Sequence, residues 1–170
     1  MLMAWLVPAA GPARDQLTAA IGMLAAKHGA PRFEPHVTMA GLFHSGEESA
    51  IQALTSLTAG VRPFEVKFSA PGYEQSYFRA LYLRAEPAPQ LTALHEAAQV
   101  AWALDVRPYL PHLSLLYADI AEVQKRAIID ALGIQLPLTI RIEAAELWVD
   151  HPAGVRSWRR LARVPLSGHA

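Results

Sequence analysis

The chain has 170 residues, 52% of them hydrophobic and 18% charged, so it can bury a sizeable core and is not of the disordered class. Its 15 basic and 15 acidic residues give a formal net charge of zero, which argues against a broad binding surface for long nucleic acids. The lack of cysteine excludes disulfides, thiol catalysis and cysteine-ligated metals.

The N-terminal apolar run ends after seven residues, at Pro8. This is too short for a signal peptide or a membrane span, so we expect a cytoplasmic protein without a membrane partner. Hydrophobic periodicity and turn residues predict seven strands and four helices. In chain order these are a strand over 3–7, a helix over 12–28, a strand over 36–43, a helix over 50–57, strands over 64–68 and 77–84, a helix over 91–102, a strand over 112–117, a helix over 123–131, and strands over 138–149 and 157–164.

Local signals predict where two of these helices begin. Ser45 with Glu48, and Asp119 with Glu122, have the spacing of a capping box, in which side chains bond to free backbone N–H groups. Each half of the chain runs strand, helix, strand, helix, strand, and no linker separates the halves. We therefore expect a single domain over residues 1–170, built from two fused, pseudo-symmetric lobes around a central groove.

A tetrapeptide of the form Pro-His-apolar-Ser/Thr occurs twice, at residues 35–38 and 111–114. Because residues i and i+2 of a strand point to the same face, His36 should lie beside Thr38, and His112 beside Ser114. Two such pairs facing each other supply two proton-transfer groups and two neutral hydrogen-bond donors. The alternative is two structural histidines at strand starts, with proline as local punctuation.

This set of groups suits in-line displacement at a phosphodiester. One neutral imidazole can take a proton from water while one protonated imidazole gives a proton to the departing oxygen. The hydroxyls of Thr38 and Ser114 can donate to the non-bridging phosphate oxygens. No metal or other cofactor is required, and no two histidines have the close helical spacing, with a carboxylate between them, of a metal site.

With their flanking residues, the two motifs resemble the 2H phosphoesterase superfamily, and within it the cyclic phosphodiesterases of plant and yeast type. The resembling segments span nearly the whole chain and lie at residues 5–8, 33–38, 77–83, 94–95, 108–117, 147–148 and 158. The resemblance implies an α+β fold with two lobes of antiparallel sheet, outer helices and a groove between the lobes. It also implies that His112 is the catalytic base and His36 the acid, and that Thr38 and Ser114 bind phosphate.

Three further site residues follow from the resemblance. Trp5 would contact the nucleoside, although core packing explains it equally well, and Phe78 would line the base pocket. Tyr117 would lie near the phosphate, yet its odd spacing from His112 points it to the other face unless the strand ends or bulges there. The remaining tryptophans and His95 are expected to pack structurally, the tryptophans being Trp102, Trp148 and Trp158.

The expected function is metal-independent hydrolysis of nucleoside 2′,3′-cyclic phosphates, of ADP-ribose 1″,2″-cyclic phosphate, or of both. The expected partners are a small cyclic-phosphate nucleotide and RNA 3′ ends, with the protein a monomer. One alternative is a phosphoesterase of the same superfamily that acts on RNA termini or 2′,5′-linked oligonucleotides, although only three lysines are present. Another is a nucleotide-binding module without turnover, which would not need two proton-transfer groups.

Overall fold

The computed structural model describes residues 1–106 and 108–168, and the predicted succession of elements is present in this part of the chain. In order they are β1 (Leu2–Pro8), α1 (Pro12–His28), β2 (Val37–Phe43), α2 (Glu47–Thr58), β3 (Phe64–Gly72), β4 (Leu81–Ala85), α3 (Pro89–Ala101), β5 (His112–Leu116), α4 (Glu122–Asp130), β6 (Leu138–Val149) and β7 (Arg159–Pro165). Short 3-10 turns precede β4 and β7, at Tyr77–Arg79 and Val155–Ser157.

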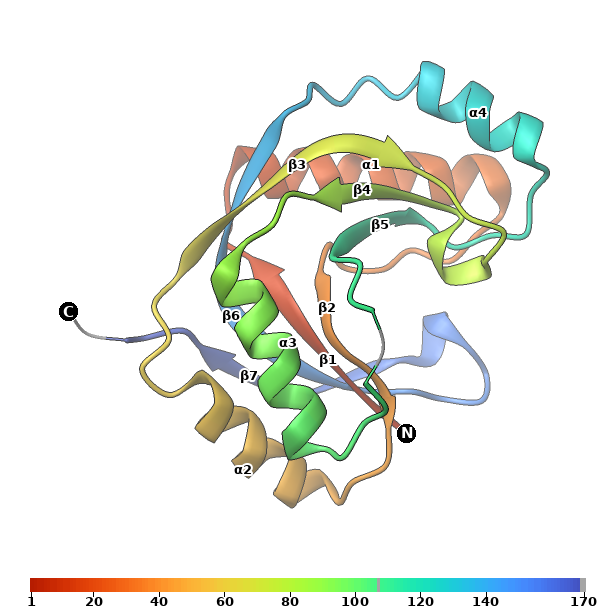
Figure 1. Cartoon of the computed structure of the whole chain (residues 1–170). Coiled ribbons are helices and arrows are strands. Elements are labelled where there is room, and N and C mark those ends of the chain that lie inside the picture. Colours follow the sequence, from red (N-terminus) through yellow and green to blue (C-terminus); the bar gives the residue numbers. More distant parts are fainter. Residues whose placement is uncertain (107, 169–170) are drawn as a thin grey trace.

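One antiparallel sheet contains all of these strands, in the order β1-β2-β5-β4-β3-β6-β7. A further pairing between β1 and β6 closes the first six strands into a barrel-like sheet, with β7 added beside β6 (Figure 1). Closure gives the backbone groups of both β1 and β6 a partner strand on each side, so neither is left as a sheet edge.

The expected fold is α+β with antiparallel strands, and this is confirmed, but the expectation of two lobes with separate sheets is wrong. The third strand of each half pairs with the first strand of the other half: β3 pairs with β4, and β6 pairs with β1. The strands of the two halves correspond in pairs: β1 with β4, β2 with β5, and β3 with β6. If each strand is replaced by its counterpart, every strand keeps the same kind of neighbours around the closed sheet. The two halves are therefore pseudo-symmetric but interleaved within one sheet.

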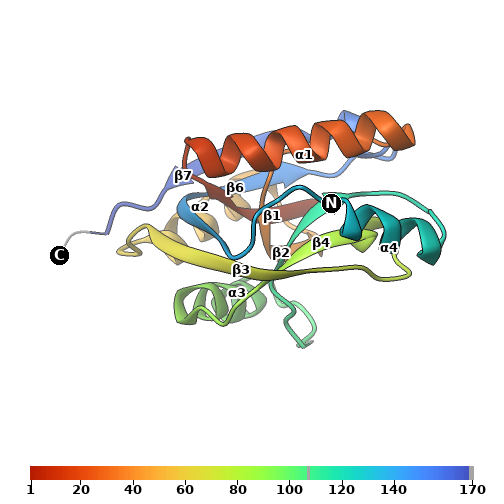
Figure 2. The ribbon, with the colours of Figure 1, turned by 90° about the horizontal axis from the view of Figure 1, so that it is seen from above.

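The helices pack on the outside of this sheet, with α1 and α3 on opposite sides of it (Figure 2). Helix α1 contacts β5 and β6, α3 contacts β2, and α2 contacts β6, β7 and α3. Pro12 at the first helical position begins α1, and Gly29 in the left-handed conformation ends it. Within the described part of the chain, no helix combines the length and the apolar character needed to cross a membrane.

Both predicted capping boxes are wrong. Helix α2 begins one residue after Gly46, which caps it without a side chain, and the Ser45 hydroxyl donates to the Gly46 carbonyl instead. Helix α4 begins at Glu122, and the Ala121 N–H donates to the side chain of Gln124 at 3.1 Å. In α4 the start is shifted because Gln124, within the first turn, satisfies a free backbone N–H in place of a residue before the helix.

The predicted strand over 77–84 begins later than expected, at Leu81. The residues before it are bent back on themselves, because the Glu74 N–H donates to the Arg79 carbonyl at 3.0 Å. The Tyr77 carbonyl accepts from the Ala118 N–H at 3.1 Å, which joins this turn to the end of β5. As a result the turn before β4 lies beside the second tetrapeptide rather than continuing the sheet.

Candidate active site

The two tetrapeptides meet where β2 joins β5. Val37 and Leu113 are cross-strand partners there, and both side chains are fully buried. Continuing this register by one residue in each direction sets His36 opposite Ser114 and Thr38 opposite His112, on the other face of the sheet. The two histidines and two hydroxyls therefore form a compact square across two neighbouring strands.

This square lines a cavity of about 320 Å³. The same cavity is bounded by β1, by the turn before β4 and by the two ends of the connection between β6 and β7. Its remaining lining residues are Met3, Trp5, Gly41, Leu42, Phe78, Arg79, Tyr117, Asp150 and Trp158. The structure thus brings together every residue that the sequence analysis assigns to catalysis or to substrate binding.

Both histidines are held by the same local bond. The Nδ1 atom of His36 lies 2.7 Å from the carbonyl oxygen of Glu34, and that of His112 lies 2.7 Å from the carbonyl oxygen of Leu110. A carbonyl oxygen can only accept, so each Nδ1 carries a hydrogen and donates it. The Nε2 atom of each ring is then the nitrogen that gains or loses a proton, as acid–base catalysis requires.

The surroundings of the two rings favour their neutral forms. The pKa of His36 is lowered from its ordinary value of 6.5 to about 4, mainly because the ring is buried. The backbone hydrogen bond to Glu34 raises this pKa, and the charge of His112 lowers it further. Burial also lowers the pKa of His112. There the bond to Leu110 raises the pKa, the Arg79 charge lowers it and the Glu74 charge raises it.

The His36 ring is fixed by a stack of aromatic side chains. The ring of Trp5 lies parallel to it at a centroid distance of 3.7 Å, and Trp148 lies on Trp5 at 4.6 Å. The Trp148 indole N–H donates to Glu146 Oε2 at 2.9 Å. Trp5 is only 2% exposed, so nearly all of its surface is covered by neighbouring side chains, among them His36 and Trp148.

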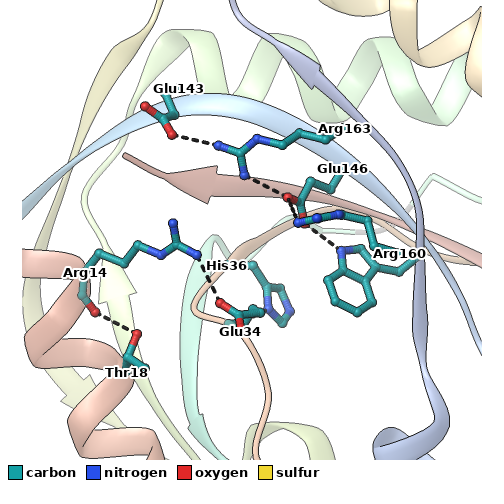
Figure 3. A network of polar contacts seen from close by, with 9 residues as sticks. Arg14, Thr18, Glu34, His36, Glu143, Glu146, Arg160 and Arg163 are labelled. Carbon is teal, nitrogen blue, oxygen red and sulfur yellow. Dashed lines mark hydrogen bonds and ion pairs between the residues drawn. The ribbon is translucent and has the colours of Figure 1, made fainter. Parts of the chain in front are cut away.

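Glu146 ends this chain of contacts as a buried carboxylate with two cationic partners. Its Oε1 atom lies 3.1 Å from an Arg160 nitrogen and 2.8 Å from an Arg163 nitrogen, and Arg163 also pairs with Glu143 (Figure 3). A buried carboxylate is stable only when it is paired and hydrogen-bonded, and here both oxygens are used. The orientation of Trp148, and through Trp5 that of His36, therefore depends on Glu146.

The two hydroxyls of the square differ in their surroundings. The Thr38 hydroxyl makes no hydrogen bond within residues 1–106 and 108–168, whereas the Ser114 hydroxyl donates to the Phe78 carbonyl at 2.9 Å. The Tyr117 hydroxyl lies 3.4 Å from His36 Nε2 and also contacts Ser114. Tyr117 reaches this face because β5 ends at Leu116, which removes the alternation that would have turned it away.

Two aromatic side chains form the outer wall of the cavity. Phe78 is 47% exposed and lies 6.0 Å from Trp158, ring centroid to ring centroid. Core packing, which the sequence analysis expects for Trp158, is therefore only part of its role, whereas Trp102 does pack in the core against Phe43. The Trp158 indole N–H donates to Asp150 Oδ1 at 2.7 Å.

Arg79 is a site residue that the sequence analysis missed. It lines the cavity from the turn before β4 and forms an ion pair with Glu74 at 2.8 Å. Its only signal in the sequence is its place beside Phe78 within a segment that carries the family resemblance. Within residues 1–106 and 108–168, no three His, Asp or Glu side chains gather closely enough to hold a metal ion.

Comparison with known proteins gives one family and several related folds. Residues 8–153 match the family described as the 2′-5′ RNA ligase superfamily. A protein of Arabidopsis thaliana named cyclic phosphodiesterase is 28% identical over 97 residues, which cover 56% of this chain and 54% of that protein. The aligned part is thus about half the length of this relative.

Solved structures share the fold at low sequence identity. E. coli LigT in complex with 3′-AMP superposes with a TM-score of 0.66 and 21% identity, covering 98% of this chain and 97% of LigT. The protein TT0787 of Thermus thermophilus superposes with a TM-score of 0.66 and 18% identity, covering 99% of both chains.

Proposed function

Because the chain belongs to the 2′-5′ RNA ligase superfamily of 2H phosphoesterases, we propose that it hydrolyses the cyclic phosphodiester of ribose. The proposed substrates are nucleoside 2′,3′-cyclic phosphates and ADP-ribose 1″,2″-cyclic phosphate. One observation carries the proposal: two histidines, each with its Nδ1 bound to a backbone carbonyl, turn Nε2 toward one cavity beside two hydroxyls. The name of the Arabidopsis relative, cyclic phosphodiesterase, supports the reaction type.

Nucleotide binding is supported by the related folds. E. coli LigT has been solved with 3′-AMP, with NADP+ and with ATP. In this chain the exposed face of Phe78 and the adjoining Trp158 offer flat apolar surface for a base. The hydroxyl of Thr38 and the guanidinium of Arg79 offer donors for phosphate oxygens.

In the proposed reaction one imidazole takes a proton from water as the water oxygen attacks phosphorus. The other imidazole gives a proton to the ribose oxygen as its bond to phosphorus breaks. Electrostatics favour His36 as the base and His112 as the acid, the reverse of the roles that the family resemblance implies. Burial holds His36 neutral, and the Tyr117 hydroxyl is placed to donate to its Nε2 lone pair, whereas the His112 ring is more exposed to solvent and can take up a proton more easily.

The proposal is tested by assaying purified protein, with and without excess EDTA, against adenosine 2′,3′-cyclic phosphate and ADP-ribose 1″,2″-cyclic phosphate. Turnover should survive chelation, because both proton transfers are assigned to side chains. His36→Ala and His112→Ala should each lower kcat by roughly 10²–10⁴-fold, and the double variant should be little worse than either. Activity that is lost on chelation and restored by a divalent ion would refute the two-histidine mechanism.

The two roles are separated by a substrate whose leaving group needs no acid. A 2′-O-methyl nucleoside 3′-(4-nitrophenyl) phosphate releases 4-nitrophenolate without protonation. With this diester, His112→Ala should lose far less activity than it loses with a cyclic phosphate, and His36→Ala should lose as much with either. The opposite pattern would restore His112 as the base and His36 as the acid.

A further inference from the structure

A second cavity adjoins the catalytic one on the side of α1. Its volume of about 390 Å³ is within the range of ligand pockets, and it shares Trp5 and Trp158 with the catalytic cavity. Its walls come from α1, from the segment before β2 and from the 3-10 turn before β7. The two cavities therefore meet at the indole rings of Trp5 and Trp158.

One wall of this cavity carries Arg32. This arginine is exposed and makes no hydrogen bond or ion pair within residues 1–106 and 108–168. Its guanidinium lies over α1 at Gly22, where an added side-chain carbon would be 3.6 Å from Arg32 Cζ. Glycine costs a helix interior about 1 kcal/mol relative to alanine, and at this position it leaves room beside the guanidinium.

A second arginine faces the same space from the turn before β7. Arg156 Nη2 lies 3.5 Å from the carbonyl oxygens of Gly29 and Ala30, at the end of α1, which directs the side chain without neutralising it. The arginines that follow on β7 differ, because each forms an ion pair with a carboxylate: Arg159 with Glu47, Arg160 with Glu146, and Arg163 with Glu143 and Glu146.

The cavity is therefore positive, although the whole chain is neutral. The carboxylate that lines it belongs to Glu34, and this carboxylate is already paired with Arg14 at 3.1 Å (Figure 3). Among the described residues, the guanidinium groups of Arg32 and Arg156 have no carboxylate partner. Guanidinium is the side-chain group best matched to two phosphate oxygens at once, and a concave wall strengthens its field on a bound anion.

We propose that this cavity is a second phosphate subsite, in which Arg32 and Arg156 bind a further phosphate group of the substrate. The inference rests on the proposed function and narrows the substrate class to ribose cyclic phosphates that carry another phosphate. The further phosphate can be the 5′-phosphate of a small nucleotide or the next phosphodiester of an RNA 3′ end. Nucleosides with the cyclic phosphate alone use the catalytic cavity and leave the subsite unfilled.

The test compares kcat/KM for three related substrates. These are adenosine 2′,3′-cyclic phosphate, its 5′-phosphorylated form, and the dinucleotide ApA with a 2′,3′-cyclic end. At least one substrate with a second phosphate should be preferred by roughly 10–100-fold, the range expected for charge-assisted hydrogen bonds. Preference for the 5′-phosphorylated form identifies small nucleotides, and preference for the dinucleotide identifies RNA ends. Equal kcat/KM for all three would overturn the subsite.

Variants assign the preference to the two arginines. Arg32→Gln and Arg156→Gln should each reduce the preference for a second phosphate. In the double variant, the ratio of kcat/KM with and without the second phosphate should be close to one, and turnover of adenosine 2′,3′-cyclic phosphate should not change. The matched control is Arg62→Gln, since Arg62 lies on the loop before β3 and is exposed, with no ion pair to any other described residue. A preference that persists in the double variant, or that falls equally in the control, would refute the assignment.

Failure of the subsite can be told apart from failure of the proposed reaction. If adenosine 2′,3′-cyclic phosphate is not hydrolysed, the reaction is wrong, but the subsite can still be tested by binding. Titration with inorganic pyrophosphate should shift the indole N–H and ring C–H signals of Trp148, which lines this cavity and not the catalytic one, but not those of Trp102, which packs against Phe43. These shifts should be absent in the Arg32→Gln, Arg156→Gln double variant, and their persistence there would count against the subsite.

Discussion

At the scale of single residues, the site depends on what each polar group does before substrate arrives. Each histidine ring donates a hydrogen bond from Nδ1 to a backbone carbonyl, and the Ser114 hydroxyl donates to the Phe78 carbonyl. The Thr38 hydroxyl, in contrast, has no partner in the described part of the chain. The sequence identified the four groups because proline and the i, i+2 spacing are local signals. It could not distinguish Thr38 from Ser114, because the partner of Ser114 lies 36 residues away in the chain.

The protonation of His36 should be visible in stability. Its pKa is about 4 in the folded protein and about 6.5 when unfolded, so between these pH values the unfolded chain binds more protons. The free energy of unfolding should therefore rise with pH through this window. The contribution is complete above pH 6.5, is lost as the pH falls to 4, and amounts to about 3 kcal/mol.

Urea unfolding between about pH 4 and pH 7.5 measures this contribution. Carboxylates also titrate in this range, so the informative quantity is the difference between wild type and His36→Gln. The variant should show a flatter pH dependence, while His44→Gln, which replaces an exposed histidine, should follow the wild type. Parallel curves for wild type and His36→Gln would mean that His36 is not buried in its neutral form.

The two hydroxyls should separate in their effect on stability. Thr38→Ala should lower kcat by roughly 10²–10³-fold, the cost of losing one donor to developing charge, whereas Ser114→Ala should lower kcat less, because the single hydroxyl hydrogen of Ser114 is already donated to the Phe78 carbonyl. Only Ser114→Ala should also lower the free energy of unfolding, by about 1 kcal/mol, because it removes the bond to the Phe78 carbonyl. Thr55→Ala, on the exposed side of α2, is the control for hydroxyl loss. Near wild-type turnover in both site variants would make these hydroxyls structural.

At the scale of elements, the register between neighbouring strands determines which side chains meet at the site. Trp5 is the cross-strand partner of Thr38 on one side and of Glu146 on the other, so three strands bring one row of side chains to the same face. Strand positions could be read from alternation along the chain, but such pairing could not, because it joins residues far apart in sequence. The roles of Glu146, Trp148 and Trp158 were missed for that reason.

Removing the Glu146 carboxylate should therefore impair catalysis without touching the substrate. Glu146→Ala leaves the Trp148 indole N–H without its acceptor and loosens the stack that holds His36. We expect kcat to fall by roughly tenfold or more with KM nearly unchanged, since small misplacements of a reacting group are costly. Glu146→Gln, which keeps an acceptor for the indole, should recover part of this loss.

The matched control is a second glutamate earlier on the same strand, Glu143. It pairs with Arg163 and lies outside the bonded chain from Glu146 to the aromatic stack, so Glu143→Ala should leave kcat unchanged. The His36 ring signals in NMR spectra should broaden in Glu146→Ala and not in Glu143→Ala. Equal effects of the two substitutions on kcat would mean that charge near β7, rather than the position of Trp148, is what matters.

At the scale of the whole molecule, the two halves are interleaved. The repeat of element order was readable in the sequence, because each element has its own periodicity and turn residues. The exchange of β3 and β6 between the halves was not readable, because no local signal tells a strand which partner to choose. Two separate lobes and two interleaved halves have the same order of elements along the chain.

Interleaving predicts that neither half folds alone. Fragments 1–75 and 76–170 would each lack partners for an exchanged strand, because β3 pairs with β4 and β6, and β6 pairs with β1. Each fragment should be unfolded by circular dichroism, whereas the mixture should regain the sheet signal and turnover. A cooperative thermal transition in either fragment by itself would show that the lobes are independent.

The short bond that each histidine makes to the carbonyl two residues before it has a consequence for design. Both bonds span a proline, whose restricted φ helps to hold the carbonyl near the ring. The choice of reactive nitrogen is therefore encoded within three consecutive residues and needs no orienting carboxylate from elsewhere. Such a segment could be grafted onto a paired strand of an unrelated antiparallel sheet and keep its tautomer, which makes it a self-contained module for building acid–base sites.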